Sequence, residues 1–190
     1  MRTVPGGFIL PNFGGPSAAA SRGTATEGGV AGATVAFSGP RKLAIICSKG
    51  NLDMAYPGLI LANAALGEGV EVHMFFTFWG FDMITKKRMA DLKFTMLGNT
   101  ATHMPQGLGG LPGMTAMATT MMRKQIASID VPTVPEMLEQ IVASGGHLWA
   151  CQMSADMMHL GKDDLYDAVE AIINASTFIE MTGGAQLLFI

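Results

Sequence analysis

Four short stretches rich in apolar residues, separated by longer segments with a helical pattern, constrain the fold of this chain most strongly. The stretches are Lys42–Ser48, Val70–Phe78, His147–Cys151 and Ala185–Ile190. The first is a continuous apolar run, which is typical of a strand buried on both faces of a sheet, and the other three are also predicted strands. Strands that alternate with helices predict an α/β fold with a mainly parallel sheet between layers of helices.

The segments between these stretches predict the helices. They are Asp53–Glu68, Met83–Leu97, Met114–Ala127, Thr133–Ser144, Ser154–His159 and a last helix that begins near Asp163 or Asp164. Thr133 and Glu136 form a T-x-x-E capping-box pattern. The last helix is indicated by the helical spacing of Leu165, Val169, Ile172 and Ile173.

Composition changes near residue 40. Residues 1–40 are rich in Gly, Ala, Ser, Thr and Pro without periodicity, and such a segment buries too little apolar surface to offset its ordering entropy. We predict a flexible N-terminal tail over residues 1–40 and one α/β domain over residues 41–190. The apolar run Phe8–Leu10 is cut short by Pro11, so we expect no secretory signal peptide.

The overall charge excludes one large class of partner. Apolar residues make up 49% of the chain, charged residues 14%, and the formal net charge is −3. A nucleic-acid surface needs clustered cations, so we expect no nucleic-acid partner. The two cysteines cannot form a disulfide scaffold, which favours a reducing, cytoplasmic location.

Both cysteines lie near the carboxyl ends of predicted strands. Cys47 is close to the end of the first strand, and Cys151 ends the third. Ligands of open α/β sheets bind outside these ends. A flavodoxin-like strand order would make the two strands neighbours, about 4.8 Å apart. Both sulfurs would then reach one crevice, unless strand alternation directs them to opposite faces.

Cys151 has the more reactive setting of the two. It precedes the helix predicted to open near Ser154, where unpaired backbone N–H groups and the helix dipole favour the thiolate. Lys49 follows Cys47 two residues later. The alternative for both cysteines is that each is a small buried hydrophobe.

The charge-free stretch Met104–Met122 follows His103. Its glycines indicate a loop that is either a lid over the Cys151 crevice, with His103 able to donate to a bound sulfur or anion, or an ordinary connection or subunit contact. Its length would allow a membrane span, but Pro105 and Pro112 interrupt a single helix, so membrane contact is a minor alternative.

The methionines in this stretch predict an interface. Met114, Met117 and Met121 share one helical face, and methionine packs adaptably. We therefore expect a homo-oligomer. The sequence holds no spacing typical of a metal site and no glycine-rich nucleotide motif, so we expect neither a metal nor a cofactor.

Four separated stretches resemble the DsrE/DsrF-like family, in the branch often labelled peroxiredoxin-like. They are Trp149–Ile172, Thr77–Lys87, Met104–Met122 and Gln186–Ile190. The resemblance implies a flavodoxin-like three-layer sandwich, homo-oligomers and intracellular sulfur trafficking. It also implies that Cys151 carries a persulfide sulfur, whereas Cys47 matches no motif of the family. The chain has no T-x-x-C loop, so we do not expect a true peroxiredoxin.

These observations lead to a hypothesis and an alternative. The hypothesis is a sulfur carrier or sulfurtransferase that loads Cys151 and passes the sulfur to an acceptor thiol, with Cys47, Lys49, His103 and Ser154 as possible supporting residues. Rhodanese-like or small sulfur-carrier proteins would be its donors and acceptors. The alternative is a non-catalytic oligomeric binding module, associated with a membrane through Met104–Met122.

Overall fold

The computed structural model describes residues 41–94 and 113–190. The tail predicted over residues 1–40 lies outside the described residues, as do His103 and the part of Met104–Met122 before residue 113. The division of the chain at residue 40 and the lid role of His103 therefore stay predictions.

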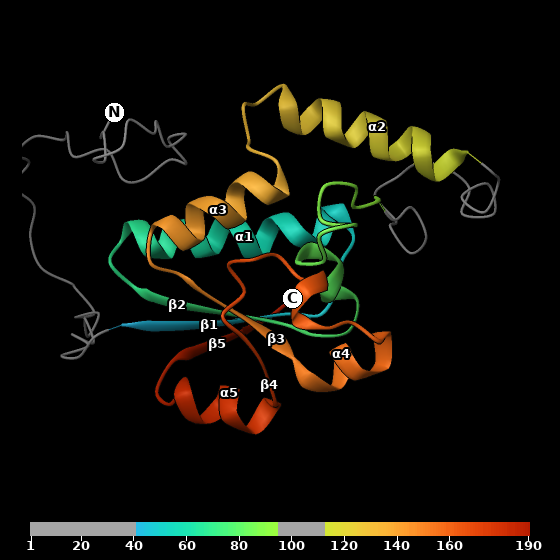
Figure 1. Cartoon of the computed structure of the whole chain (residues 1–190). Coiled ribbons are helices and arrows are strands. Elements are labelled where there is room, and N and C mark those ends of the chain that lie inside the picture. The colour runs from blue at the N-terminus through green and yellow to red at the C-terminus, as the bar shows by residue number, and fades with distance from the viewer. Residues whose placement is uncertain (1–40, 95–112) are drawn as a thin grey trace, which may run out of the picture. The chain divides into compact units, whose positions relative to one another are not determined.

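Parallel strands form the central layer of the described chain (Figure 1). They are β1 (Lys42–Cys47), β2 (Glu71–Phe76), β3 (His147–Cys151), β4 (Ala171–Ile173) and β5 (Gln186–Phe189). The order across the sheet is β4-β3-β2-β1-β5, and every neighbouring pair is parallel. β1 to β3 read as continuous apolar runs because both of their faces are covered by other elements.

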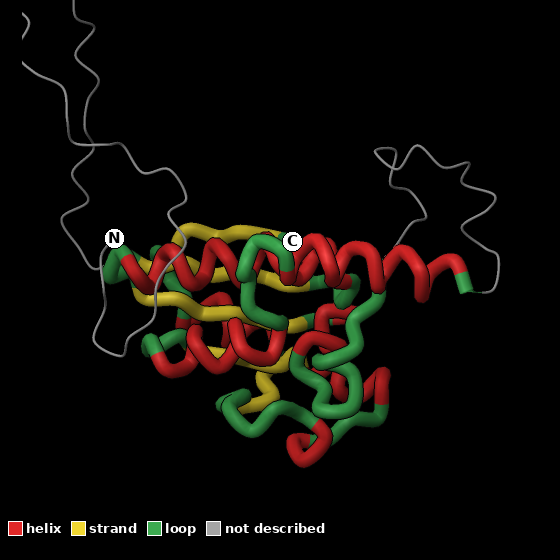
Figure 2. The backbone as a smooth tube through the Cα atoms, turned by 90° about the horizontal axis from the view of Figure 1, so that it is seen from above, coloured by secondary structure: helices red, strands yellow, loops and turns green. Residues whose placement is uncertain are grey.

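Helices cover both faces of this sheet (Figure 1), and the view from above in Figure 2 shows them running roughly along the strands. On one face lie α1 (Leu52–Gly67) and α3 (Val134–Ala143), and on the other lie α4 (Gln152–Met158) and α5 (Ala175–Met181). This arrangement confirms the predicted α/β three-layer sandwich with a parallel sheet. α2 (Met114–Ala127) extends away from the sandwich and buries only Thr119.

The predicted capping box opens α3. The backbone N–H and the hydroxyl of Thr133 both donate to Glu136 Oε2, each at 2.7 Å. These bonds from Thr133 lower the pKa of the Glu136 carboxyl, because they favour its ionised form. The box satisfies donors that the first turn of a helix otherwise leaves unpaired.

The helix predicted over Met83–Leu97 is wrong. A short 3₁₀ helix, η1 (Phe78–Met83), ends at the first residue of the predicted helix, and the described residues after it, 84–94, contain turns but no helix. The backbone of this segment forms isolated turns, such as the bond from the N–H of Met89 to the carbonyl of Thr85 at 2.9 Å, and the N–H of Lys86 donates outside the segment, to the carbonyl of Asp164 at 3.0 Å. An isolated bridge between Thr85 and Leu165 joins the same two segments. Tertiary pairing has therefore overridden the helical pattern.

The helix predicted to begin near Asp163 is also wrong. Only a single 3₁₀ turn, η3 (Lys162–Asp164), forms there, and the apolar residues further on enter strand β4 instead. Ile172 and Ile173 are β-branched and pair with β3, where such side chains pack well. The helix that follows, α5, begins at Asn174, whose side chain accepts a hydrogen bond from the N–H of Thr177 at 2.8 Å.

The segment after β2 packs tightly against the end of β1. The N–H of Thr77 donates to the carbonyl of Cys47 at 3.0 Å. A Cβ atom placed on Gly80 would lie 2.0 Å from that same carbonyl oxygen, and one placed on Gly50 would lie 2.1 Å from the carbonyl oxygen of Trp79. Only glycine allows backbones to approach so closely.

Replacing Gly80 by Ala therefore destabilises the fold. The added methyl group meets a backbone oxygen that cannot rotate away, so we expect the free energy of unfolding to fall by about 1–3 kcal/mol. Gly67→Ala is the matched control, because nothing lies within 4 Å of a Cβ there. In a helix that change should stabilise by up to about 1 kcal/mol. Urea unfolding followed by circular dichroism measures both, and equal effects of the two substitutions would contradict the proposed packing.

Candidate functional site

The two cysteines lie at the same edge of the sheet but on opposite faces. Strand β2 separates their strands, so the predicted neighbourhood of the first and third strands is wrong. Cys47 is in register with Phe76, and Phe76 with Ala150. In-register residues of parallel strands share a face and successive residues alternate, so Cys151 points away from the face of Cys47. The two thiols therefore do not share one crevice.

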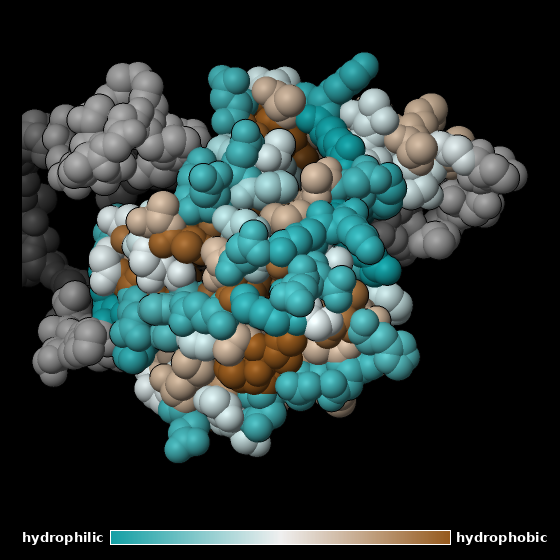
Figure 3. All heavy atoms as spheres, viewed as in Figure 1, coloured by the Kyte–Doolittle hydropathy of each residue, from teal (hydrophilic) through white to brown (hydrophobic). Residues whose placement is uncertain are grey.

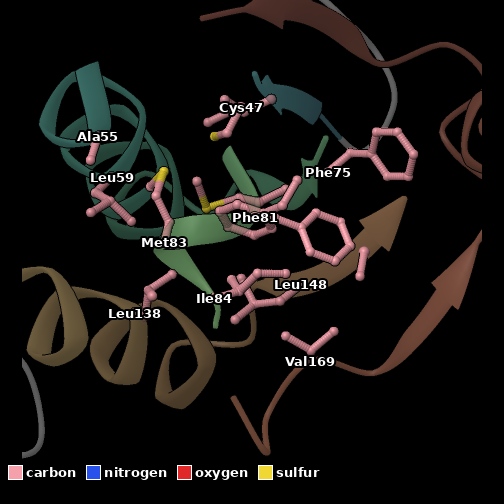
Figure 4. Close-up of a cluster of buried hydrophobic side chains, with 14 of the residues drawn as sticks. Cys47, Ala55, Leu59, Phe75, Phe81, Met83, Ile84, Leu138, Leu148 and Val169 are labelled. Carbon is pink, nitrogen blue, oxygen red and sulfur yellow. The ribbon is translucent and has the colours of Figure 1, made fainter. Parts of the chain in front are cut away.

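Cys47 faces α1 and is enclosed there. A Cβ atom on Gly58 of α1 would lie 3.4 Å from its sulfur. Figure 4 shows Cys47 in the same buried cluster as Leu59 and Phe81, and only 3% of its surface is exposed. This burial raises the pKa of the Cys47 thiol to about 12, because the charged form loses its hydration. Near neutral pH, Cys47 is thus a neutral, hydrophobic thiol.

Cys151 occupies the junction between β3 and α4. It is the last residue of the strand and the N-cap residue of the helix, with φ −76° and ψ 123°. It shares a sheet face with Trp149, whose in-register partner Phe75 stacks on Phe178 of α5, and 4% of its surface is exposed. The first turn of a helix carries backbone N–H groups without intrahelical partners. The side chain of Cys151 makes no capping hydrogen bond to this turn, so its sulfur lies buried at the N-terminus of α4.

Ser154 holds this junction in place. Its side chain is buried, and its hydroxyl oxygen accepts a hydrogen bond from the N–H of Phe78 at 2.7 Å. The hydroxyl of Thr77 lies 3.2 Å away, within hydrogen-bond distance. Within the described part of the chain, no hydrogen bond joins Ser154 to Cys151. Ser154 thus fastens α4 to the segment after β2, and supports Cys151 through position.

Lys49 lines an open groove of about 720 Å³ whose lining includes neither cysteine. Sequence reasoning missed most of this groove. It is lined by Lys49, Gly50, Asn51, Trp79, Asp82, Lys87, Arg88, Asp91, Leu92 and Lys93. The sequence feature that could have indicated the groove is the run of three cations at 86–88, which follows the aromatic residues after the second strand.

A second polar cluster lies on the sheet toward the start of β2 and β3. The rings of His73 and His147 stack with centroids 4.7 Å apart. His73 Nε2 lies 2.8 Å from Glu71 Oε1, and Trp149 Nε1–H donates to His73 Nδ1 at 3.2 Å. The Nδ1 atom of His73 thus faces the indole N–H of Trp149, and its Nε2 atom faces the carboxylate of Glu71. The cluster ties the two strands together on the face of Cys151.

Two features are absent from the described residues, a metal cluster and a membrane-spanning helix. Residues 41–94 and 113–190 contain no group of three or more His, Cys, Asp or Glu side chains arranged to hold a metal ion. Within the same ranges, none of the helices has both the length and the apolar character needed to span a membrane.

Comparison with known proteins places the chain among relatives of similar length. The model of the DsrE/DsrF/DrsH-like family matches residues 40–189. The sulfur carrier protein DsrE2 of Allochromatium vinosum is 38% identical over 155 residues, which cover 77% of this chain and 96% of that protein. The uncharacterized protein YrkE of Bacillus subtilis is 29% identical over 155 residues, covering 79% and 97%.

The fold also matches a solved structure. The protein of unknown function MTH1491 from Methanobacterium thermoautotrophicum superimposes with a TM-score of 0.50 at 8% identity, covering 79% of this chain and 99% of that one. At this identity the likeness concerns the fold alone. The match of the family model over most of the chain and the 38% identity to one relative lead to one conclusion: this protein belongs to the DsrE/DsrF/DrsH-like family.

Proposed function

We propose that this protein is a sulfur carrier that holds sulfane sulfur as a persulfide on Cys151. The observation that carries the proposal is the contrast between its two cysteines. A sulfur carrier needs a thiolate, and the chain contains only Cys47 and Cys151. Cys47 is enclosed and its pKa is about 12, so it does not supply a thiolate near neutral pH. Cys151, at the N-cap of α4, is the remaining candidate.

The proposed reaction moves one sulfur atom without net oxidation. The Cys151 thiolate attacks the outer sulfur of a donor persulfide, R–S–SH, and forms a new S–S bond. The S–S bond of the donor breaks, its electron pair leaves with the inner sulfur as R–S⁻, and the proton stays on the transferred sulfur. An acceptor thiolate then attacks the outer sulfur on Cys151, forms its own persulfide and releases the Cys151 thiolate.

The surroundings of Cys151 support carriage more than acid–base catalysis. The junction is fixed because Ser154 binds the N–H of Phe78. The sulfur is held at the end of β3, and the small exposed fraction of Cys151 limits its contact with stray thiols and oxidants. The relative that is named a sulfur carrier protein matches most of this chain at 38% identity, which supports the same role here.

A sulfur carrier also needs a suitable cellular compartment and partner proteins. A persulfide carrier with two unpaired cysteines suits a reducing compartment, so we place it in the cytoplasm. Its donors and acceptors would be proteins with accessible thiols, such as rhodanese-like or small sulfur-carrier proteins. The proposal assigns no role at Cys151 to Lys49 or His103, because Lys49 lines a groove that does not include Cys151 and His103 lies outside the described residues.

Cys151→Ser abolishes sulfur loading on this account. The native protein is incubated with sodium tetrasulfide, and intact mass spectrometry measures the adduct of one sulfur atom, about 32 Da. Cys47→Ala is the matched control and should load like the unchanged protein. Circular dichroism verifies that both variants fold, and Cys151→Ala replaces the serine variant if that one does not. Loading that survives in Cys151→Ser and vanishes in Cys47→Ala would refute the proposal.

We also propose that the chain forms a homo-oligomer through α2. Met117 and Met121 on this helix are 58% and 62% exposed in the single chain. Figure 3 shows a few pale brown, moderately apolar side chains on this helix among white and teal ones. Apolar side chains gathered on one exposed surface are typical of an interface. The alternative, a non-catalytic oligomeric binding module, depends on the same surface and is favoured if Cys151 proves unreactive.

Met117→Asp should dissociate such an oligomer, because it buries an unpaired charge at the contact. Met117→Leu, which keeps the apolar contact, is the control and should leave the mass unchanged. Light scattering at micromolar concentration measures the mass directly. A mass near the 20.0 kDa of one chain for the unchanged protein would rule out the oligomer. An Asp variant that stays assembled would place the interface elsewhere.

A further inference from the structure

The open groove lies where this topology favours ligand binding. From β1 the chain moves to β2 on one side, and β5 later pairs on the other side, so the strand order reverses at β1. In open α/β sheets ligands bind outside the carboxyl ends of the strands at such a reversal. Lys49, Gly50 and Asn51 follow β1 directly and line the groove. Cys151 ends β3, two strands away, so the groove is a separate site.

The groove carries an excess of positive charge. Its lining holds four cationic side chains and two carboxylates, although the whole chain has a formal charge of −3. Asp82 is paired with Arg88 at 2.6 Å. Asp91 is paired with Lys93 and, at 2.8 Å, with Arg123. Hydrogen bonds from Lys93 and Arg123 lower the pKa of the Asp91 carboxyl. Each of the two carboxylates thus lies in an ion pair that offsets its charge.

Two cations that line the groove have no carboxylate partner among the described residues. Within residues 41–94 and 113–190, Lys49 and Lys87 make no salt bridge or side-chain hydrogen bond. Both side chains line the groove, so their positive charges act on the same bound ligand. Two unpaired cations in one concave site attract a ligand with two negative charges more strongly than isolated surface lysines do.

An aromatic wall completes the groove. Trp79 is 61% exposed, and its indole offers a flat apolar surface beside the cations. The close approach of Gly50 to the carbonyl of Trp79 fixes the backbone on which this side chain stands. A volume of about 720 Å³ falls within the range of small-molecule sites. The groove thus offers positive charge to an anionic group and a flat apolar surface to a planar or apolar part of the same ligand.

We propose that this groove binds a small organic anion with two or more negative charges and a planar or apolar part that lies on Trp79. Lys49 and Lys87 hold the negative groups, and the indole of Trp79 contacts the remainder. A nucleoside monophosphate combines both parts, whereas oxidised glutathione has the negative charges with a flexible, non-planar remainder. Inorganic sulfate has the charge but lacks the second part. The site is independent of sulfur transfer at Cys151.

The test uses the full chain with Cys151→Ser, which excludes thiol exchange with a disulfide probe. Calorimetric titrations with adenosine monophosphate, oxidised glutathione and sulfate separate the sources of the anion. We expect saturable binding of at least one organic probe, tighter than that of sulfate. Trp79 fluorescence in a Trp149→Phe background provides a second signal, because the chain has two tryptophans.

Charge reversal locates the site. Lys49→Glu and Lys87→Glu should each weaken binding of the organic probe about tenfold or more, and added salt should weaken this binding further. Lys124→Glu on α2 lies outside the groove and is the matched control, with an expected change below about twofold. Trp79→Ala should reduce binding of the organic probe and leave that of sulfate unchanged.

Three results would overturn the proposal. The first is that none of the probes binds saturably. The second is that the lysine variants of the groove and Lys124→Glu weaken binding equally, since that indicates only overall charge. The third is that sulfate binds as tightly as the organic probes and Trp79→Ala changes nothing. Because none of these measurements involves sulfur loading, their failure would leave the role proposed for Cys151 intact.

Discussion

The close contact between Gly80 and the carbonyl of Cys47 organises the whole carboxyl edge of the sheet. It holds the segment after β2 against the end of β1, together with the hydrogen bond from Thr77. Because that segment is fixed, the N–H of Phe78 meets Ser154 and secures the start of α4. The same segment presents Trp79 to the groove on the other side. One packing constraint thus positions the thiol of the proposed function and the wall of the proposed anion site.

Local sequence patterns predicted those elements whose residues interact mainly with their neighbours in the chain. The strands β1 to β3 and β5 have uninterrupted apolar runs, and the Thr133–Glu136 box marks the start of α3 through contacts three residues apart. The segment from Met83 and the strand β4 were missed. Their backbone groups pair with remote segments, as Lys86 does with Asp164, and helical spacing contains no information on such partners.

The site was predictable only in part for the same reason. A cysteine at a strand–helix junction can be identified from neighbouring residues, and Cys151 lies at such a junction. The relation between Cys151 and Cys47 depends on strand order, which places β2 between them. The groove depends on contacts between the end of β1 and the segment 79–93, so Lys49 could be named from the sequence but not placed. Long-range pairing, and not residue type, was the missing information.

The central claim is that Cys151, and not Cys47, is the working thiol. Both thiols are buried, but burial raises the pKa of Cys47 to about 12, whereas Cys151 lies at the N-terminus of α4 on the other face. Differential alkylation of the unchanged protein tests this contrast most directly. Native protein is treated briefly with light iodoacetamide, then unfolded and treated with the heavy isotopic form, and peptides are mapped by mass spectrometry. The account predicts light label on Cys151 and heavy label on Cys47, and the reverse distribution would contradict it.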